Sequence, residues 1–147
     1  MVEIVVLIKQ VPDTNAKIEI KDGTADLSMI KWITSPYDEY ALEIALQHKE
    51  AVGGNVTALT LGPNRCDKAL KDAKALGVDG IARIDVSDGY LDSFSVQSML
   101  AEACKSLGAE IIYCGKAAAD TNAGSTGPGV AEKLGWPSIS NLSLIHI

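Results

Sequence analysis

Residues Ile111 to Pro128 read IIYCGKAAADTNAGSTGP, and this segment says most about the fold. A short apolar run ends at Gly115, and a turn rich in small and hydroxyl-bearing residues follows it. The next residues, GVAEKLG, are typical of the start of a helix. Small residues let the backbone approach a ligand closely, and the first N–H groups of a helix have no partner inside it. The pattern therefore suits an anion such as phosphate, although any tight strand-to-helix connection has the same outline.

The rest of the chain alternates strand-like and helix-like segments. Four apolar runs are typical of strands buried on both faces of a parallel sheet, at residues 2–8, 56–61, 81–86 and 111–114. Apolar residues at helical spacing follow each strand, at residues 37–50, 65–76, 96–107 and 130–134. This alternation predicts an α/β fold with an open, doubly wound, mostly parallel Rossmann-like sheet. Residues 16–27 alternate around Asp22 and Gly23, which predicts a small N-terminal hairpin.

Local signals refine two of the helices. Ser35 is a plausible cap for the helix at 37–50, and Pro36 suits its first turn. We expect the inward side of this helix to carry Tyr37, Tyr40, Ala41, Ile44 and Ala45. In the helix at 65–76 we expect Ala69, Ala73 and Leu76 to face inward, and Gly77 to close the helix.

Composition narrows the function classes. The chain has 147 residues, enough for one domain, and a net charge of −6, whereas nucleic-acid-binding domains normally show a basic face. No apolar run approaches the roughly 20 residues that span a bilayer, so we expect no membrane insertion. The first ten residues read as a strand rather than a signal peptide, and the three cysteines form no C-x-x-C pair. We therefore expect a cytoplasmic protein without a metal site.

No catalytic constellation is recognisable. The chain contains no G-x-S-x-G, H-E-x-x-H or G-x-x-x-x-G-K-[ST] motif, and we expect His48 to lie on the polar edge of a helix. What remains is a binding crevice, because ligands of open parallel sheets lie beyond the carboxyl ends of the strands. Those ends carry residues 7–14, 61–63 and 115–126.

Six motifs stand in register along the chain: IKQVPD, SPYDEYALE, TLGP, ALGVD, GK-x3-D with TGP, and LGWP. In this order and at these spacings the chain closely resembles the β subunit of electron transfer flavoproteins, from Met1 to Asn141. The resemblance implies an adenine-nucleotide-binding α/β domain at residues 1–141. It also implies an electron-carrier subunit without catalytic residues of its own, paired with an α subunit as a heterodimer.

The resemblance implies two cofactors, AMP and FAD. AMP would be structural, with its adenosine against Leu7, Ser35, Pro36, Tyr37, Asp38, Leu61 and Gly115. Its phosphate would lie on the turn formed by Asp120, Thr121, Asn122, Ala123, Gly124, Ser125 and Thr126. The Thr126 hydroxyl and the N–H groups of Gly124 and Ser125 would donate to it. The FAD would be held mainly by the α subunit, with Pro12, Asp13, Thr14 and Tyr37 near its isoalloxazine ring.

The implied partners are the α subunit, acyl-CoA or other flavin dehydrogenases as electron donors, and a quinone oxidoreductase or another acceptor. One alternative is a bifurcating-type subunit, which binds a second FAD in place of AMP. Such subunits tend to carry an acidic-Thr-Ala-Gln-Val pattern before the Gly-Pro, where this chain has residues 122–126 as NAGST, so AMP is favoured.

Two further alternatives share the broad architecture. A stand-alone ATP-binding stress-type domain would show G-x2-G-x9-G-[ST], and here Ala118 stands where the second glycine belongs. A nucleotide-activating enzyme would show S-G-G-x-D-S after the first strand, where residues 9–13 read KQVPD.

The last six residues, LSLIHI, do not fit the resemblance. These letters are what a transposase sequencing adapter gives when it is translated. We therefore expect the domain to be incomplete at its C-terminus and residues 142–147 to be a non-native tail. The alternative is a natural short strand after Trp136 and Pro137.

Overall fold

The computed structural model describes residues 1–87 and 89–142. Its centre is a four-stranded parallel sheet in the order β7-β6-β1-β8. The strands are β1 (Val2–Leu7), β6 (Gly54–Gly62), β7 (Gly80–Asp85) and β8 (Ile111–Cys114). The chain moves outward from β1 to β7 and then returns to place β8 on the other side of β1, as in a doubly wound Rossmann-like sheet. The predicted fold class is confirmed.

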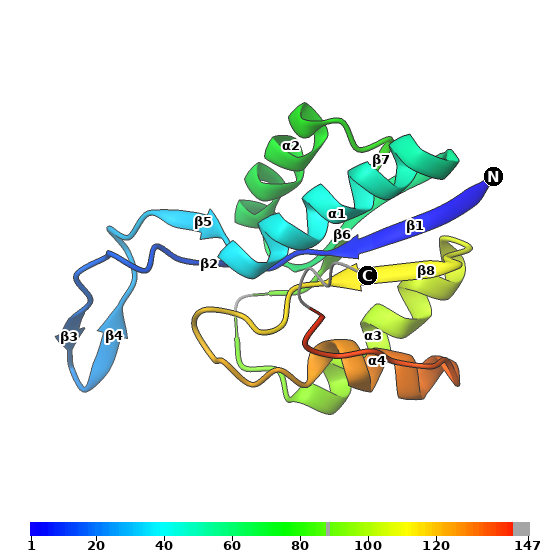
Figure 1. Cartoon of the computed structure of the whole chain (residues 1–147). Helices are drawn as coiled ribbons and strands as arrows, with labels where there is room; N and C mark the ends of the chain where they lie inside the picture. Colours follow the sequence, from blue (N-terminus) through cyan, green and yellow to red (C-terminus); the bar gives the residue numbers. More distant parts are fainter. Residues whose placement is uncertain (88, 143–147) are drawn as a thin grey trace.

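Helices cover both faces of this sheet, as Figure 1 shows. On one face lie α1 (Pro36–Val52) and α2 (Asp67–Leu76), the latter preceded by the 3₁₀ turn η1 (Asn64–Cys66). On the other lie α3 (Ser93–Ser106) and α4 (Thr126–Leu134). Successive side chains of β1 point to opposite faces, so Ile4 and Val6 pack under α1 and α2, while Val5 and Leu7 pack against α3 and α4. Burial on both faces explains why the central strand is a continuous apolar run.

Two small antiparallel pairs lead away from the main sheet. The first joins β2 (Gln10–Pro12) to β5 (Trp32–Thr34), and the second joins β3 (Glu19–Lys21) to β4 (Thr24–Asp26). Asp22 and Gly23 connect β3 to β4 with φ of 51° and 76°, the left-handed pair that a two-residue hairpin turn requires. The hairpin projects from the body at the left of Figure 1. It is the hairpin predicted from the sequence.

The inward face of α1 differs from the prediction. Its buried residues are Asp38, Ala41, Leu42 and Ala45, whereas the side chains of Tyr37, Tyr40 and Ile44 are 46%, 70% and 50% exposed. The prediction was right for the two alanines and wrong for the larger residues. The buried face of α1 includes two alanines, and such small side chains let the helix lie close to the sheet. The spacing of apolar residues alone does not predict which side of the helix is buried.

Two smaller predictions also need correction. In α2 Leu70 is buried beside Ala69 and Ala73, while Leu76 is 65% exposed. Ser35 does stand at the N-cap position of α1, but its side chain makes no capping hydrogen bond. Gly77 closes α2 in the left-handed region, with φ of 117°, as predicted. Of the predicted tail at 142–147, residues 143–147 lie outside the described residues.

Candidate functional site

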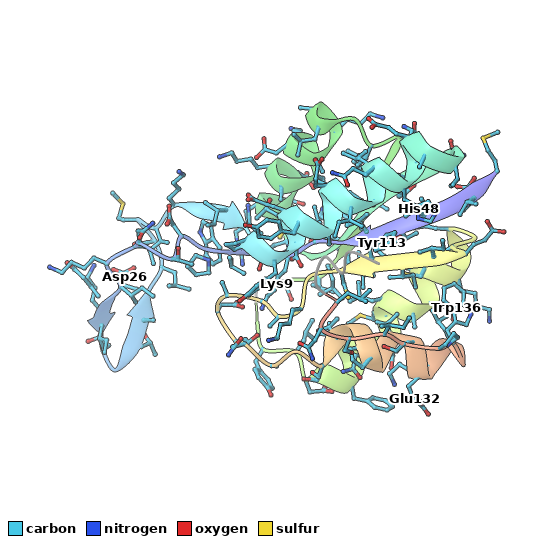
Figure 2. The ribbon with its side chains drawn as sticks, viewed as in Figure 1. Lys9, Asp26, His48, Tyr113, Glu132 and Trp136 are labelled. Carbon is cyan, nitrogen blue, oxygen red and sulfur yellow. The ribbon has the colours of Figure 1, made fainter. Side chains whose placement is uncertain are left out.

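The carboxyl ends of β1 and β8 lie side by side, because Leu7 pairs in register with Cys114. The chain reverses its winding direction between these two strands, and ligands of doubly wound sheets bind at such a reversal. Three segments meet there: residues 8–10 after β1, residues 115–125 after β8, and the first turn of α1. We call these three segments the strand-end site. Figure 2 shows the labelled Lys9 side chain at this edge of the sheet.

Asp38 joins the three segments. Its Oδ2 accepts a hydrogen bond from the backbone N–H of Lys9 at 2.8 Å, and its Oδ1 accepts one from the backbone N–H of Gly115 at 3.0 Å. The residue is only 7% exposed. Burial raises the pKa of the Asp38 carboxyl to about 6, and the two N–H donors act in the opposite direction. One carboxylate therefore connects the ends of both strands to α1.

Gly115 is required by this close approach. A Cβ placed on it would lie 2.3 Å from Asp38 Oδ1, 2.7 Å from the carbonyl carbon of Tyr37 and 2.8 Å from its Cβ. All three distances are shorter than non-bonded carbon contacts allow. The sequence predicted a glycine that permits close approach, and here the backbone that approaches is that of α1.

The segment after β8 is tied back to β1 through a surface ion pair. Lys9 Nζ lies 2.8 Å from Asp120 Oδ1, and both side chains are partly exposed. Lys9 was not among the predicted site residues, although it stands within the IKQVPD motif. No local pattern reveals this pair, because the two residues are 111 positions apart in the sequence.

The turn that precedes α4 presents backbone N–H groups that have no acceptor among the described residues. Asn122 and Gly124 adopt φ of 50° and 64°, and Asn122 N–H donates to the carbonyl of Ala118. Ser125 stands at the N-cap position without a capping side-chain bond. Within residues 1–87 and 89–142, the N–H groups of Gly124, Ser125 and Thr126 have no hydrogen-bond acceptor. This arrangement suits a phosphate.

Gln97 of α3 contacts the same turn through its side-chain amide. Its Nε2 donates to the carbonyl of Ser125 at 3.1 Å, and its side chain packs against Gly129 so closely that a Cβ there would lie 2.1 Å from its Cδ. Sequence reasoning missed Gln97, because its role depends on how α3 packs against α4. Gly127 is similarly tight, since a Cβ there would lie 2.6 Å from Cys114 Sγ. Burial raises the pKa of Cys114, which keeps this thiol in its neutral form.

The other residues predicted to contact AMP surround the same edge. Leu7 is buried at the end of β1, and Leu61 is half-buried near the end of β6. Ser35 N–H donates to the carbonyl of Lys9 at 2.8 Å, and the fully buried Ser35 hydroxyl has no partner among the described residues. Pro36 is half-buried and Tyr37 is 46% exposed beside Gly115. The chain segments predicted to contact AMP thus lie together at the strand-end site.

Three of the four residues predicted near FAD, Pro12, Asp13 and Thr14, lie on a separate part of the chain, whereas Tyr37 lies at the strand-end site beside Gly115. Pro12 ends β2 opposite Trp32 of β5, and Asp13 and Thr14 follow at the base of the hairpin. Asp13 Oδ1 accepts from Asn15 N–H at 2.9 Å, and a shallow hollow beside it is also lined by Ala16 and Ile30. The guanidinium of Arg65 stacks over the Trp32 ring at 3.7 Å.

His48 lies away from the strand-end site. It was expected on the polar edge of α1, and it is half-buried there, with Nδ1 2.8 Å from the hydroxyl of Tyr113 on β8 (Figure 2). This contact joins α1 to the edge strand β8. In the described part of the chain no group of three or more His, Cys, Asp or Glu side chains is placed to hold a metal ion. Nor does that part contain a helix with the length and apolarity to cross a membrane.

The sheet order and the strand-end site define a doubly wound α/β domain of the Rossmann type. Residues 26–147 match the family model described as the electron transfer flavoprotein domain, and the chain belongs to this family. This confirms the family predicted from the six motifs.

Several curated relatives align with nearly the whole chain. It is 36% identical over 144 residues to the electron transfer flavoprotein subunit beta of Bacillus subtilis (strain 168), which covers 97% of this chain and 56% of the relative. It is 36% identical over 142 residues to the acryloyl-CoA reductase electron transfer subunit gamma of Anaerotignum propionicum, covering 93% and 53%. It is 37% identical over 139 residues to the protein FixA of Sinorhizobium fredii (strain NBRC 101917 / NGR234), covering 89% and 48%. The chain spans about half the length of these relatives.

Proposed function

We propose that this chain is the nucleotide-binding part of an electron transfer flavoprotein β subunit, and that AMP at the strand-end site serves as a structural ligand. The observation that carries this proposal is the turn before α4, whose N–H groups at Gly124, Ser125 and Thr126 have no acceptor within the described residues. A bound phosphate would satisfy these donors and would also complement the positive end of the helix.

The expected affinity follows from the number of donors. Each hydrogen bond to a charged phosphate contributes about 1.5–3 kcal/mol. The helix terminus adds up to about 1 kcal/mol. Three such bonds, together with the Thr126 hydroxyl, correspond to a dissociation constant on the order of micromolar. Leu7 and Leu61 would offer apolar contacts to the adenosine, and Ser35, Pro36 and Tyr37 with Gly115 would bound it on the α1 side.

In this proposal the redox chemistry belongs to an FAD held mainly by an α subunit in a heterodimer. That cofactor accepts and releases the electrons, whereas the protein supplies binding, orientation and electrostatics. Pro12, Asp13, Thr14 and Tyr37 would border its ring from the β-subunit side. Electrons would arrive from acyl-CoA or other flavin dehydrogenases and leave to a quinone oxidoreductase or another acceptor. The residues of this chain would thus shape the flavin's surroundings without forming a covalent intermediate.

Nucleotide analysis of the intact complex tests the proposal. The complete β subunit that contains this sequence is co-produced with its α subunit, the complex is denatured, and the released nucleotides are separated and quantified. We expect one AMP and one FAD per heterodimer. Two FAD without AMP would support the bifurcating-type alternative, and ATP on an isolated subunit would support a stress-type domain. The absence of any nucleotide at this site would refute the proposal.

A substitution tests whether the phosphate of AMP lies on the turn before α4. Thr126→Val removes the hydroxyl and keeps the side-chain shape, so AMP affinity should fall about tenfold, as expected for one hydrogen bond to a charged group. Thr24→Val on the projecting hairpin is the matched control, because the Thr24 hydroxyl donates to the carbonyl of Lys21 within the same hairpin. Equal affinities of the two variants would argue against a phosphate at Thr126.

A further inference from the structure

We propose that Asp38 is a positioning residue, whose carboxylate fixes the ends of β1 and β8 in the arrangement that the nucleotide needs, without touching the nucleotide itself. This inference rests on the proposed function of the strand-end site. It assigns to Asp38 a role different from the direct contact with adenosine that the family resemblance implies.

Both carboxylate oxygens are already engaged inside the protein. Oδ2 accepts from Lys9 N–H at 2.8 Å and Oδ1 accepts from Gly115 N–H at 3.0 Å. The side chain is buried, and the two donors belong to two different strand ends. One charged group therefore determines how far apart, and in which orientation, the two loops leave the sheet.

The position of the Asp38 carboxylate affects the loops on both sides of the site, the one after β1 and the one after β8. From the Lys9 backbone fixed by Asp38, the ammonium group reaches Asp120 at the start of the turn before α4. From the Gly115 backbone, the loop runs to Gly124 and Ser125, whose N–H groups have no acceptor among the residues that the structure describes. A shift of the carboxylate would displace both loops, and with them the donors aimed at a phosphate.

The role depends on the negative charge. A carboxylate accepts two N–H donors at once, whereas an asparagine offers one oxygen and turns its NH₂ group toward the other donor. A protonated Asp38 has the same defect. The titratable groups that face it are Lys9 from the end of β1, Asp120 from the loop and Cys114 from β8. Since burial raises the pKa of Asp38 to about 6, the arrangement should loosen as the pH falls through that value.

The test compares AMP affinity of three complexes by calorimetric titration between pH 5 and pH 8: the complete heterodimer, its Asp38→Asn variant and a Glu39→Gln control. Glu39 is the exposed neighbour in the same helical turn and also loses one negative charge. The phosphate of AMP itself titrates near pH 6, so the informative quantity is the ratio of variant to wild-type dissociation constants. We expect a ratio of about 10 at pH 8 for Asp38→Asn, falling toward 1 at pH 5 as wild-type Asp38 becomes protonated. The control ratio should stay near 1 throughout.

A double-mutant cycle separates positioning from direct contact. Gly115→Ala displaces the Asp38 carboxylate by steric overlap, so the affinity losses of Asp38→Asn and Gly115→Ala should not add in the double variant. Additive losses, or a ratio for Asp38→Asn that does not change with pH, would overturn the positioning role.

A measurement on the unmutated complex covers the case in which Asp38→Asn does not fold. Adenosine 5′-sulfate carries an anion that does not titrate in this range, so its affinity for the wild-type complex should decline as the pH falls below about 6, the pKa of Asp38. A flat profile would contradict the inference. If wild type binds neither AMP nor the sulfate at any pH, the proposed function itself fails; if it binds both and Asp38→Asn matches the control, only the inference fails.

Discussion

Replacing Gly115 by alanine is the substitution whose cost the structure defines most closely. The new Cβ would lie 2.3 Å from Asp38 Oδ1, 2.7 Å from the Tyr37 carbonyl carbon and 2.8 Å from Tyr37 Cβ. Two of these atoms belong to the backbone of α1 or are attached to it, so they do not move without shifting the helix. The third belongs to a buried carboxylate that is also held by Lys9.

The expected loss of stability combines two effects. Overpacking by one methyl group in a close-packed region costs about 1–3 kcal/mol. Separating Gly115 N–H from the Asp38 carboxylate leaves a buried donor and a buried charge less well satisfied, at a further cost of about 1–3 kcal/mol. We therefore expect the free energy of unfolding to fall by about 4 kcal/mol, the middle of the summed range.

Urea unfolding of the complete subunit, followed by circular dichroism, measures this loss as a shift of the midpoint at constant slope. Gly89→Ala is the matched control, because a Cβ at Gly89 meets nothing within 4 Å. The control should change the free energy of unfolding by less than about 0.5 kcal/mol. A loss below about 1 kcal/mol for Gly115→Ala would contradict this prediction, since it would mean that α1 and the end of β8 move apart at little energetic cost.

Three further predictions concern stability. Burial raises the pKa of Asp38 from 3.8 to about 6. The stabilisation that proton binding to Asp38 gives the folded state is therefore fully present below pH 3.8 and is lost as the pH rises through 6. Asp38→Asn should remove this pH dependence, about 3 kcal/mol, from the free energy of unfolding measured in urea. Leu59→Ala should lower the free energy of unfolding by about 2–5 kcal/mol in the same assay, because Leu59 of β6 is 1% exposed and belongs to the core cluster on the α3 face of the sheet. Tyr113→Phe should cost about 1 kcal/mol, because it removes the half-buried hydrogen bond to His48.

Each of these has a clear opposite outcome. An unchanged pH dependence in Asp38→Asn would show that Asp38 ionises with equal ease in the folded and unfolded chains. A loss below 1 kcal/mol for Leu59→Ala would mean that the site collapses around the smaller side chain. If Tyr113→Phe and a His48→Ala variant have fully additive costs, the two side chains are not coupled.

The order and type of the main elements were predictable from the sequence, since the apolar runs and the glycines that follow them reflect local physics. The hairpin followed from Asp22 and Gly23, which together supply the left-handed turn. The orientation of α1 was not predictable. Apolar residues occur on two sides of this helix, and only contact with the sheet decided that Ala41 and Ala45 would be buried and Tyr40 exposed.

The strand-end site shows the same division. The family and the small-residue turn at 120–126 were predictable from the amino-acid order, because they depend on residue type and spacing along the chain. The hydrogen bonds from Lys9 and Gly115 N–H to Asp38, and the ion pair between Lys9 and Asp120, arise only when the chain is folded. The partners in these contacts are separated by 29, 77 and 111 positions, and such distances are closed only when the strands pair and α1 packs against them. A local sequence pattern does not predict these contacts, because they form only when the whole sheet and its helices pack together.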